Sequence, residues 1–140
     1  MKNKVMVGCL EQCDLPDLKI QGLHVRVDTG AATSSLHVDN IEEFEEDDAL
    51  WISFDLHPDI HDVKRLTRCK SKVAGKRKVK SSTATKQKRY VIETEIVMAE
   101  QRWTIQLTLT DRSEMTYLML LGREAMSGRF TVDPELEYLL

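Results

Sequence analysis

Long hydrophobic runs and paired cysteines are both missing from this chain of 140 residues. No apolar stretch approaches the length that a membrane-spanning helix needs. The apolar run before Cys9 is too short for the hydrophobic region of a signal peptide, so we interpret it as a first strand and expect a cytoplasmic protein. The three cysteines, an odd number without paired spacing, indicate reduced thiols rather than a disulfide framework or a zinc knuckle.

The helical His-Glu-x-x-His motif of zinc peptidases is also absent. His57 and His61 are four residues apart, but Pro58 between them disfavours a helix. Asp59 and Asp62 could complete an oxygen–nitrogen site around these histidines, and a solvated acidic loop is the alternative interpretation. We predict that the chain holds no metal.

Nucleotide-binding motifs are missing as well. Gly75-Lys76 lacks both the earlier glycine and the following Ser or Thr of a phosphate-binding loop, and the sequence contains no Gly-x-Gly-x-x-Gly. Aromatic residues make up only 6% of the chain, and Tyr90 alone borders its basic segment, so we do not expect nucleic-acid binding. We therefore expect no cofactor and no requirement for ATP or zinc.

Opposite charges occupy separate parts of the sequence. Residues 27–63 contain eleven acids and no Lys or Arg, whereas residues 64–89 contain twelve Lys or Arg and no acid. The acidic cluster at 42–48 is expected to form a solvated loop or a short helix. The basic segment neutralises this cluster, forms a face that binds an acidic peptide or, as the interpretation we favour least, contacts nucleic acid or the ribosome. In the second case the binding residues would be Lys76, Arg77, Lys78 and Lys80.

Alternating apolar and polar residues predict a nearly all-β fold. Apolar positions recur with period two at 103–109 and at 23–27, and residues 51–56 and 89–99 also have the composition of strands. A hairpin connection is expected at Glu100-Gln101, and residues 122–127 are expected to form one short helix. Short strands with tight links predict a small closed or partly open β-barrel, formed by a single domain over residues 1–140.

The string VDTGAATSSLH at 27–37 contains the most informative motif. Asp-Thr-Gly followed by a small residue is how aspartic proteases present a catalytic carboxylate. Asp28 would supply that carboxylate, flanked by Thr29, while Gly30 would permit the tight turn and Ala31 would leave space beside it. The alternative is an ordinary polar turn at the end of a strand.

A second string, MLLGREAMSGRF at 119–130, is similar to a segment that packs beneath the Asp-Thr-Gly turn in retropepsins. Leu120, Leu121, Gly122 and Arg123 fit its apolar-apolar-Gly-Arg pattern. In many retropepsins the arginine pairs with a second acid that follows the Asp-Thr-Gly motif. Ala32 occupies that position here, so Arg123 needs another partner, and we consider Glu11 and Glu124.

A broader resemblance covers most of the chain. Residues 8–18, 27–37, 51–58, 88–94, 107–115, 119–126 and 130–139 resemble the family labelled putative ATP-dependent zinc proteases. The resemblance implies a retropepsin-like fold and an association with an ATP-grasp glutamate ligase. The motifs in this chain favour the aspartic chemistry of that fold over the zinc and ATP of the label.

The number of catalytic carboxylates predicts a homodimer. Aspartic proteases need two facing aspartates, but Asp111 and Asp133 lack the glycine turn that follows Asp28. A second copy of the chain would therefore complete the pair across a twofold axis. The segment 71–89 is the candidate for a flap over the substrate, although its only glycine is Gly75.

Two functions follow from the sequence. The first is a retropepsin-like endopeptidase that cleaves peptides or proteins, including glutamate-rich tails. The second is a non-catalytic module with a protease fold that binds and regulates a partner such as the glutamate ligase.

Overall fold

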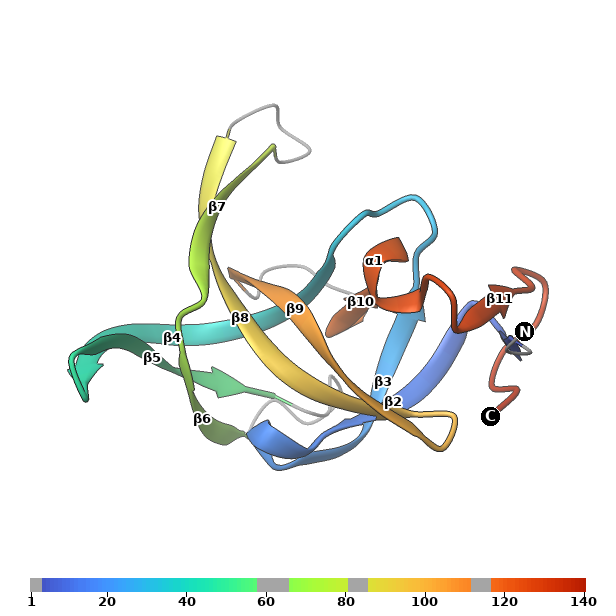
Figure 1. Cartoon of the computed structure of the whole chain (residues 1–140), viewed down its shortest axis with the longest axis horizontal. Helices are drawn as coiled ribbons and strands as arrows, with labels where there is room; N and C mark the ends of the chain where they lie inside the picture. The colour runs from blue at the N-terminus through green and yellow to red at the C-terminus, as the bar shows by residue number, and fades with distance from the viewer. Residues whose placement is uncertain (1–3, 58–65, 81–85, 112–116) are drawn as a thin grey trace.

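The computed structural model describes residues 4–57, 66–80, 86–111 and 117–140. Its elements, in chain order, are β1 (Val5–Val7), β2 (Leu10–Leu15), the 3-10 turn η1 (Pro16–Leu18), β3 (Ile20–Val27), β4 (Ser34–Glu46), β5 (Ala49–Leu56), β6 (Thr67–Lys72), β7 (Gly75–Lys80), β8 (Lys86–Met98), β9 (Gln101–Asp111), β10 (Met119–Leu121), α1 (Arg123–Met126) and β11 (Phe130–Val132). The predicted all-β fold with one short helix is confirmed for these residues (Figure 1). None of their helices is long and apolar enough to cross a membrane.

A closed ring of strands forms the body of the molecule. The ring runs β10-β3-β2-β8-β9-β4 and closes because β10 also pairs with β4. β5 and β6 extend the sheet beyond β4, and β7 pairs with β8 outside the ring. β1 and β11 form a separate parallel pair near the two termini (Figure 1). The barrel predicted from period-two patterning is therefore closed.

Alternating side chains fill the barrel. In β3 the buried positions are Ile20, Leu23, Val25 and Val27, and in β9 they include Ile105 and Leu107. In the outer parts of these strands one face enters the core while the other meets solvent, whereas residues 107–110 of β9 are buried on both faces. The same core extends under β5 and β6 through Phe54 and Cys69, which are also buried.

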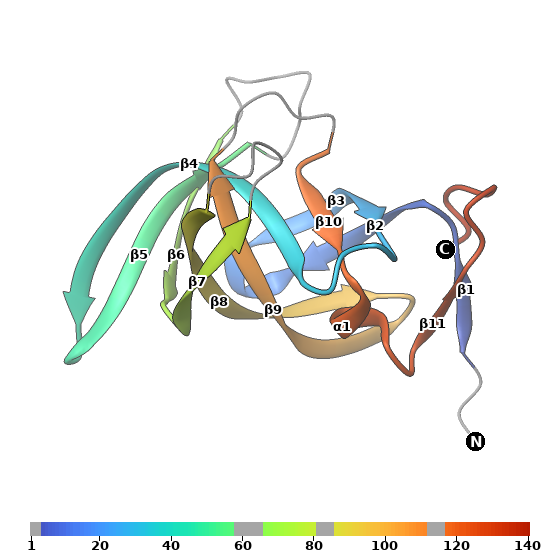
Figure 2. The ribbon, with the colours of Figure 1, turned by 90° about the horizontal axis from the view of Figure 1, so that it is seen from above.

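The acidic segment is a strand, which corrects the expectation of a loop or short helix. Glu42 to Glu46 complete β4, and the turn at Asp47-Asp48 leads into β5 to form a long hairpin that extends from the barrel (Figure 2). Phe44 stacks on Trp51 across the hairpin with ring centroids 6.4 Å apart. Cross-strand pairs of this kind stabilise a sheet, and they outweigh the low strand propensity of glutamate.

The hairpin between β8 and β9 also differs slightly from the prediction. Its two turn residues are Ala99 and Glu100, with φ of 55° and 60°, and Met98 pairs with Gln101. Two consecutive positive φ values match the twist of the flanking strands, as in type I′ turns. The connection therefore lies one residue earlier than the pattern indicated.

The C-terminal segment is fastened to the N-terminal strands. The Cys9 N–H donates to the Leu136 carbonyl at 2.8 Å. The carboxylate of Glu11, only 1% exposed, accepts hydrogen bonds from the N–H groups of Gly8, Leu139 and Leu140. These contacts satisfy a buried charge with backbone donors and fix the last residues beside β2.

Candidate active site

Asp28 lies in the turn that follows β3. Its N–H donates to the Leu121 carbonyl at 2.9 Å, and one of its carboxylate oxygens, Oδ1, accepts from the Gly30 N–H at 2.9 Å. Asp28 is half-buried, whereas Thr29 and Gly30 are exposed. The backbone thus fixes the carboxylate at the surface of the barrel, where a second molecule can reach it.

Gly30 serves the turn in a different way from the one predicted. Its φ is not among the positive values in the described chain, so the left-handed freedom of glycine is not used. A Cβ at this position would instead come within 3.2 Å of Asp28 Oδ1. The missing side chain therefore provides space next to the carboxylate.

The segment from β10 into α1 packs directly against this turn. The Gly122 N–H donates to Ser34 Oγ at 2.9 Å, and the Arg123 N–H donates to the Ala31 carbonyl at 2.8 Å. Leu121 is buried and pairs with Val27. The structure therefore brings together the turn residues and the supporting residues that the two motifs predicted, and it adds Ser34, whose role no sequence pattern indicated.

The hydrogen-bond partner of the Arg123 side chain is a backbone carbonyl group. Its guanidinium donates to the Thr29 carbonyl at 2.9 Å. The proposed pairing with Glu11 is wrong, because that carboxylate binds the C-terminal backbone. A charge-assisted hydrogen bond to a carbonyl replaces the ion pair that an acid at Ala32 would have supplied.

The described basic residues of β7 contact other elements. Lys76 Nζ lies 3.4 Å from Glu43 Oε1 and 5.4 Å from the centre of the Tyr90 ring, and Arg77 donates to Gln106 at 3.2 Å. A hydrogen bond to Glu43 raises the pKa of Tyr90 to about 12. The side chains of the other two predicted residues, Lys78 and Lys80, lie outside the described part.

Among the described residues, ion pairs connect the basic segment to Asp55 of β5, which pairs with Arg68 at 3.1 Å, and to the acidic part of β4. Arg68 also pairs with Glu42 at 3.5 Å, Lys70 pairs with Glu46 at 3.4 Å, and the third pair with β4 is the one that Lys76 forms. This arrangement supports the neutralisation interpretation for these residues. The arm formed by β7 and β8 nevertheless stands at the same end of the molecule as the loop between β3 and β4 (Figure 1).

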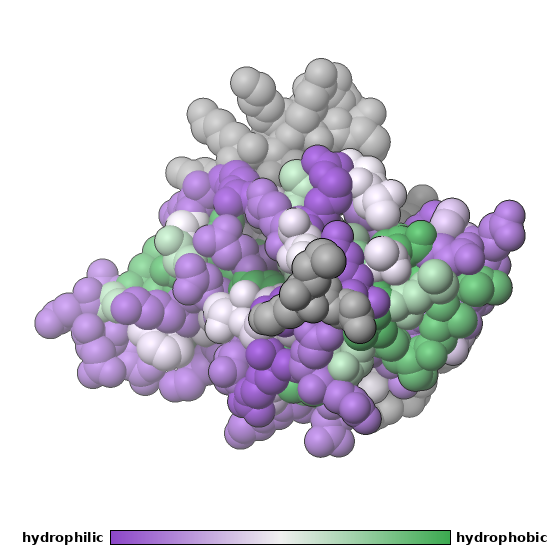
Figure 3. Space-filling view, turned by 45° about the vertical axis from the view of Figure 1, so that its right-hand side comes forward, coloured by the Kyte–Doolittle hydropathy of each residue, from purple (hydrophilic) through white to green (hydrophobic). Residues whose placement is uncertain are grey.

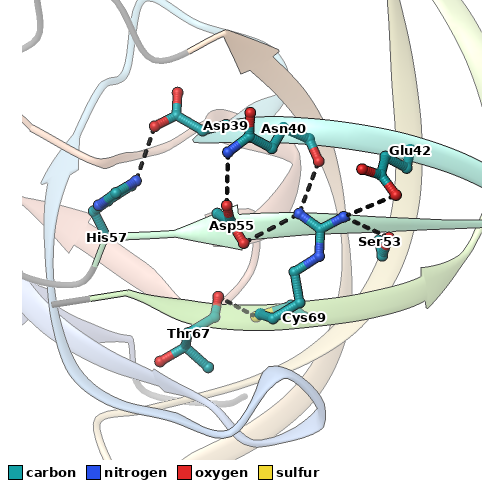
Figure 4. A network of polar contacts seen from close by, with 9 residues as sticks. Asp39, Asn40, Glu42, Ser53, Asp55, His57, Thr67 and Cys69 are labelled. Atoms are coloured by element: carbon teal, nitrogen blue, oxygen red, sulfur yellow. Dashed lines mark hydrogen bonds and ion pairs between the residues drawn. The ribbon is translucent and has the colours of Figure 1, made fainter. Parts of the chain in front are cut away.

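A polar network occupies β4, β5 and β6 (Figure 4). His57 Nε2 lies 2.8 Å from Asp39 Oδ2, and Asn40 donates to Asp55 at 2.8 Å. The hydrogen bond from Asn40 and the nearby Arg68 guanidinium hold the pKa of Asp55 below its usual range. Within the residues that the structure describes, no group of His, Cys, Asp or Glu is arranged to hold a metal ion. His61, Asp59 and Asp62 lie outside those residues.

The closed barrel and the Asp-Thr-Gly turn, supported by an apolar Gly-Arg segment, define a retropepsin-like protein. Residues 6–140 match the family described as "Retropepsin-like aspartic endopeptidase RimB". The chain belongs to this RimB-like family. The description that matches names an aspartic enzyme, in agreement with the motif.

Curated relatives and a solved structure extend this result. A "Probable alpha-L-glutamate ligase" from Parasynechococcus marenigrum is 49% identical over 135 residues, which are 96% of this chain and 29% of that protein. A protein of the same name from Shewanella pealeana is 45% identical over 138 residues, 99% of this chain and 30% of that protein. The chain therefore spans less than a third of the length of these relatives. A crystal structure of a Legionella pneumophila protein of unknown function superposes with a TM-score of 0.82 at 28% identity, covering 98% of both chains.

Proposed function

We propose that this chain is one half of an aspartic peptidase. The observation that carries the proposal is the half-buried carboxylate of Asp28, fixed in its turn by the hydrogen bonds of Asp28 N–H and Gly30 N–H. The sequence contains no second Asp-Thr-Gly, so the partner carboxylate comes from Asp28 of a second copy. Two facing carboxylates at roughly 3 Å share one proton, because both cannot ionise at that distance.

In the proposed reaction the ionised carboxylate removes a proton from a water molecule, which attacks the scissile carbonyl. The protonated carboxylate donates a hydrogen bond to the carbonyl oxygen and stabilises the charge that develops there. Proton transfer to the departing nitrogen then breaks the C–N bond and restores the shared proton. The chemistry requires neither a metal nor a nucleotide.

An apolar surface near the termini supports a twofold partner. The exposed large hydrophobic side chains include Met6, Leu136, Tyr138, Leu139 and Leu140. Hydrophobic atoms gather on the right-hand side of Figure 3, toward which the C-terminal segment turns. Clusters of this kind mark interaction sites on soluble proteins.

This terminal surface is connected to the catalytic turn through two backbone hydrogen bonds. The Val27 N–H donates to the Cys9 carbonyl at 2.9 Å, and the Cys9 N–H donates to Leu136. Val27 directly precedes Asp28, so a copy docked on the terminal surface lies close to the turn. We place the twofold axis of the proposed homodimer here.

The proposed substrate is an acidic peptide, such as a glutamate-rich tail. We propose that the β7–β8 arm, which stands at the same end of the molecule as the loop between β3 and β4, acts as the flap, and that its basic residues Lys76, Arg77, Lys78 and Lys80 would meet acidic side chains. The relatives are named probable alpha-L-glutamate ligases, and a ligase that adds glutamate makes an acidic product. Their names therefore support such a product as the substrate of this chain.

The relatives also favour a second candidate function. A stretch similar to this chain forms 29–30% of proteins named as ligases. The chain would then be a non-catalytic module that binds and regulates an ATP-grasp glutamate ligase. Binding to the ligase that does not depend on Asp28 would support this alternative.

The deciding experiment compares Asp28→Asn with the wild-type protein on glutamate-rich and glutamine-rich peptides, using mass spectrometry to detect cleavage. The change is nearly isosteric and keeps an acceptor for the Gly30 N–H, so we expect an unchanged melting temperature and no cleavage. Asp48→Asn, in the exposed β4–β5 turn, is the matched control and should cleave normally. Cleavage that survives Asp28→Asn, or that a chelator abolishes, would contradict the aspartic assignment.

A further inference from the structure

β6 is an edge strand whose outer side pairs with no strand in the described parts of the chain. It pairs with β5 alone, and the Val73 N–H just after it donates to the Leu50 carbonyl at 3.0 Å. Backbone groups alternate in direction along an antiparallel strand. The N–H and C=O groups of Arg68, Lys70 and Lys72 therefore point away from β5, toward the open side.

A groove of about 830 Å³ runs along this open edge. β8 forms its far wall, where Glu93 lies. The Ala74 N–H closes one end by donating to the Val91 carbonyl at 2.8 Å, and Asp17 of η1 accepts from the Glu95 N–H at 3.1 Å. Figure 1 shows the reason for the opening: β6 continues upward into β7, which leaves β5 and joins β8.

Four cations and two acids line the groove, and two of the cations also pair with acids of neighbouring strands, Arg68 with Glu42 and Asp55 and Lys70 with Glu46. The lining cations are Lys19, Arg68, Lys70 and Lys72, and the acids are Asp17 and Glu93. Within the described residues, Lys19 and Lys72 form no ion pair, so their charges are available to a ligand. The three cations of β6 are exposed and alternate with the more buried Cys69 and Ser71. Cations at every second position of an edge strand match acids at every second position of an added strand.

An unsatisfied donor lies in the same region. Trp51 lines the groove, and its buried indole N–H has no acceptor among the described residues. Buried polar groups in folded proteins nearly always have a partner. Lys70 Nζ lies 5.4 Å from the centre of the Trp51 ring. The fluorescence of this indole should therefore change when a ligand binds beside Lys70.

We propose that the free edge of β6 is a docking site for an extended acidic segment of a protein partner. The segment adds to the sheet as a further strand, with its backbone bonded to the outward groups of Arg68, Lys70 and Lys72. Its acidic side chains lie beside those three cations and Lys19. The main chain gives affinity and the alternating charges give selectivity, as in other β-strand additions. This site uses no atom of the Asp28 turn, so it remains whether or not the chain is a peptidase.

Binding is measured in the Asp28→Asn background, which prevents cleavage, with Trp103→Phe so that Trp51 is the only tryptophan. The probe is a blocked peptide of alternating Thr and Glu, about eight residues long, which spans β6 with a margin. Its control replaces every Glu with Gln. We expect the Glu peptide to change Trp51 fluorescence and to bind about tenfold more tightly at low salt, with the advantage shrinking as salt rises. Equal binding of the two peptides would overturn the proposal.

Two variants of the chain test where the peptide binds. Lys70→Gln combined with Lys72→Gln should remove the preference for Glu. Lys4→Gln combined with Arg26→Gln removes the same charge from exposed positions elsewhere and should preserve it. If the second pair weakens binding as much as the first, the peptide responds to net charge alone and the site on β6 is refuted.

A proline variant tests strand addition itself. Lys70→Pro deletes an outward N–H that takes no part in pairing with β5, and proline is tolerated at such edge positions. It should bind the Glu peptide more weakly than Lys70→Gln, which loses only the charge. Strand addition is also tested with two modified peptides, one methylated at the backbone nitrogens of its Glu residues and the other at those of its Thr residues. One of these two peptides should lose binding and the other should keep it, whereas binding that survives both changes would overturn strand addition.

Discussion

Gly122→Ala tests how tightly the β10 segment supports the Asp28 turn. A Cβ at Gly122 would lie 2.6 Å from both the carbonyl carbon and the oxygen of Thr33, and 3.0 Å from the Ala31 carbonyl oxygen. These are backbone atoms, so they cannot rotate away as the end of a side chain can. Reaching the 3.4 Å at which ordinary contact begins requires the loop to move by about 0.8 Å. Gly122 itself has φ −91° and ψ 175°, values that alanine adopts freely, so the cost is steric alone.

Overpacking of this kind costs about 1–3 kcal/mol of folding free energy. For a chain of this length that lowers the melting temperature by roughly 4–12 °C. The assay is urea and thermal unfolding, with the amide signal of Gly30 followed by NMR because its N–H reports on Asp28. Gly75→Ala is the matched control, since a Cβ there meets nothing within 4 Å. If Gly122→Ala is as stable as Gly75→Ala and leaves the Gly30 signal in place, the proposed support of the turn is wrong.

Three further predictions concern other parts of the molecule. Asp55→Asn should cost about 1–3 kcal/mol at pH 7, because it removes a buried acceptor of charged and amide donors. The pKa of Asp55 is lowered in the fold, so its contribution to the free energy of unfolding is present above the usual pKa of about 3.9 and is lost as the pH falls. The stabilities of the wild type and the variant should therefore converge in acid. Burial raises the pKa of Cys13 to about 12 and that of Cys69 to about 11, whereas Cys9 is half-buried. Ellman's reagent should therefore label Cys9 first in the native protein, and labelling of all three thiols at the same rate would contradict this prediction. Lys76→Glu should abolish any salt-sensitive preference for cleaving acidic peptides, with little change in melting temperature and without affecting binding at β6, whereas lost stability with an unchanged cleavage preference would assign Lys76 to the ion pair with β4.

Local patterns predicted the barrel well because apolar and polar residues alternate over much of β3 and β9. The apolar positions of β3 and β9 could be recognised without knowing their neighbours, and the turn at Asp28 follows directly from the end of β3. The acidic part of β4 was predicted wrongly because its stability comes from β5. The ion pairs of Arg68 and Lys70 with β4 join positions that no local window contains, and the stacking of Phe44 on Trp51 depends on the register of the hairpin.

The candidate site was predictable in its residue types but not in its contacts. The two motifs located Asp28 and Gly122, yet neither indicated that Ser34 binds the Gly122 N–H or that Arg123 binds the Thr29 carbonyl. Both contacts depend on how the loop folds back onto α1. The groove beside β6 was equally hidden, because it exists only where β6 and β8 separate in three dimensions.

The most direct test of the central claim mixes wild-type chains with Asp28→Asn chains and measures peptide cleavage at a constant wild-type concentration. The two proteins are refolded together so that subunits exchange freely. If the catalytic pair needs Asp28 from both copies, an equal amount of the variant should reduce the activity to about half, and a ninefold excess to about a tenth, because mixed dimers have one carboxylate. Activity that stays constant at every ratio would show that a single chain suffices and would contradict a dyad shared between two copies.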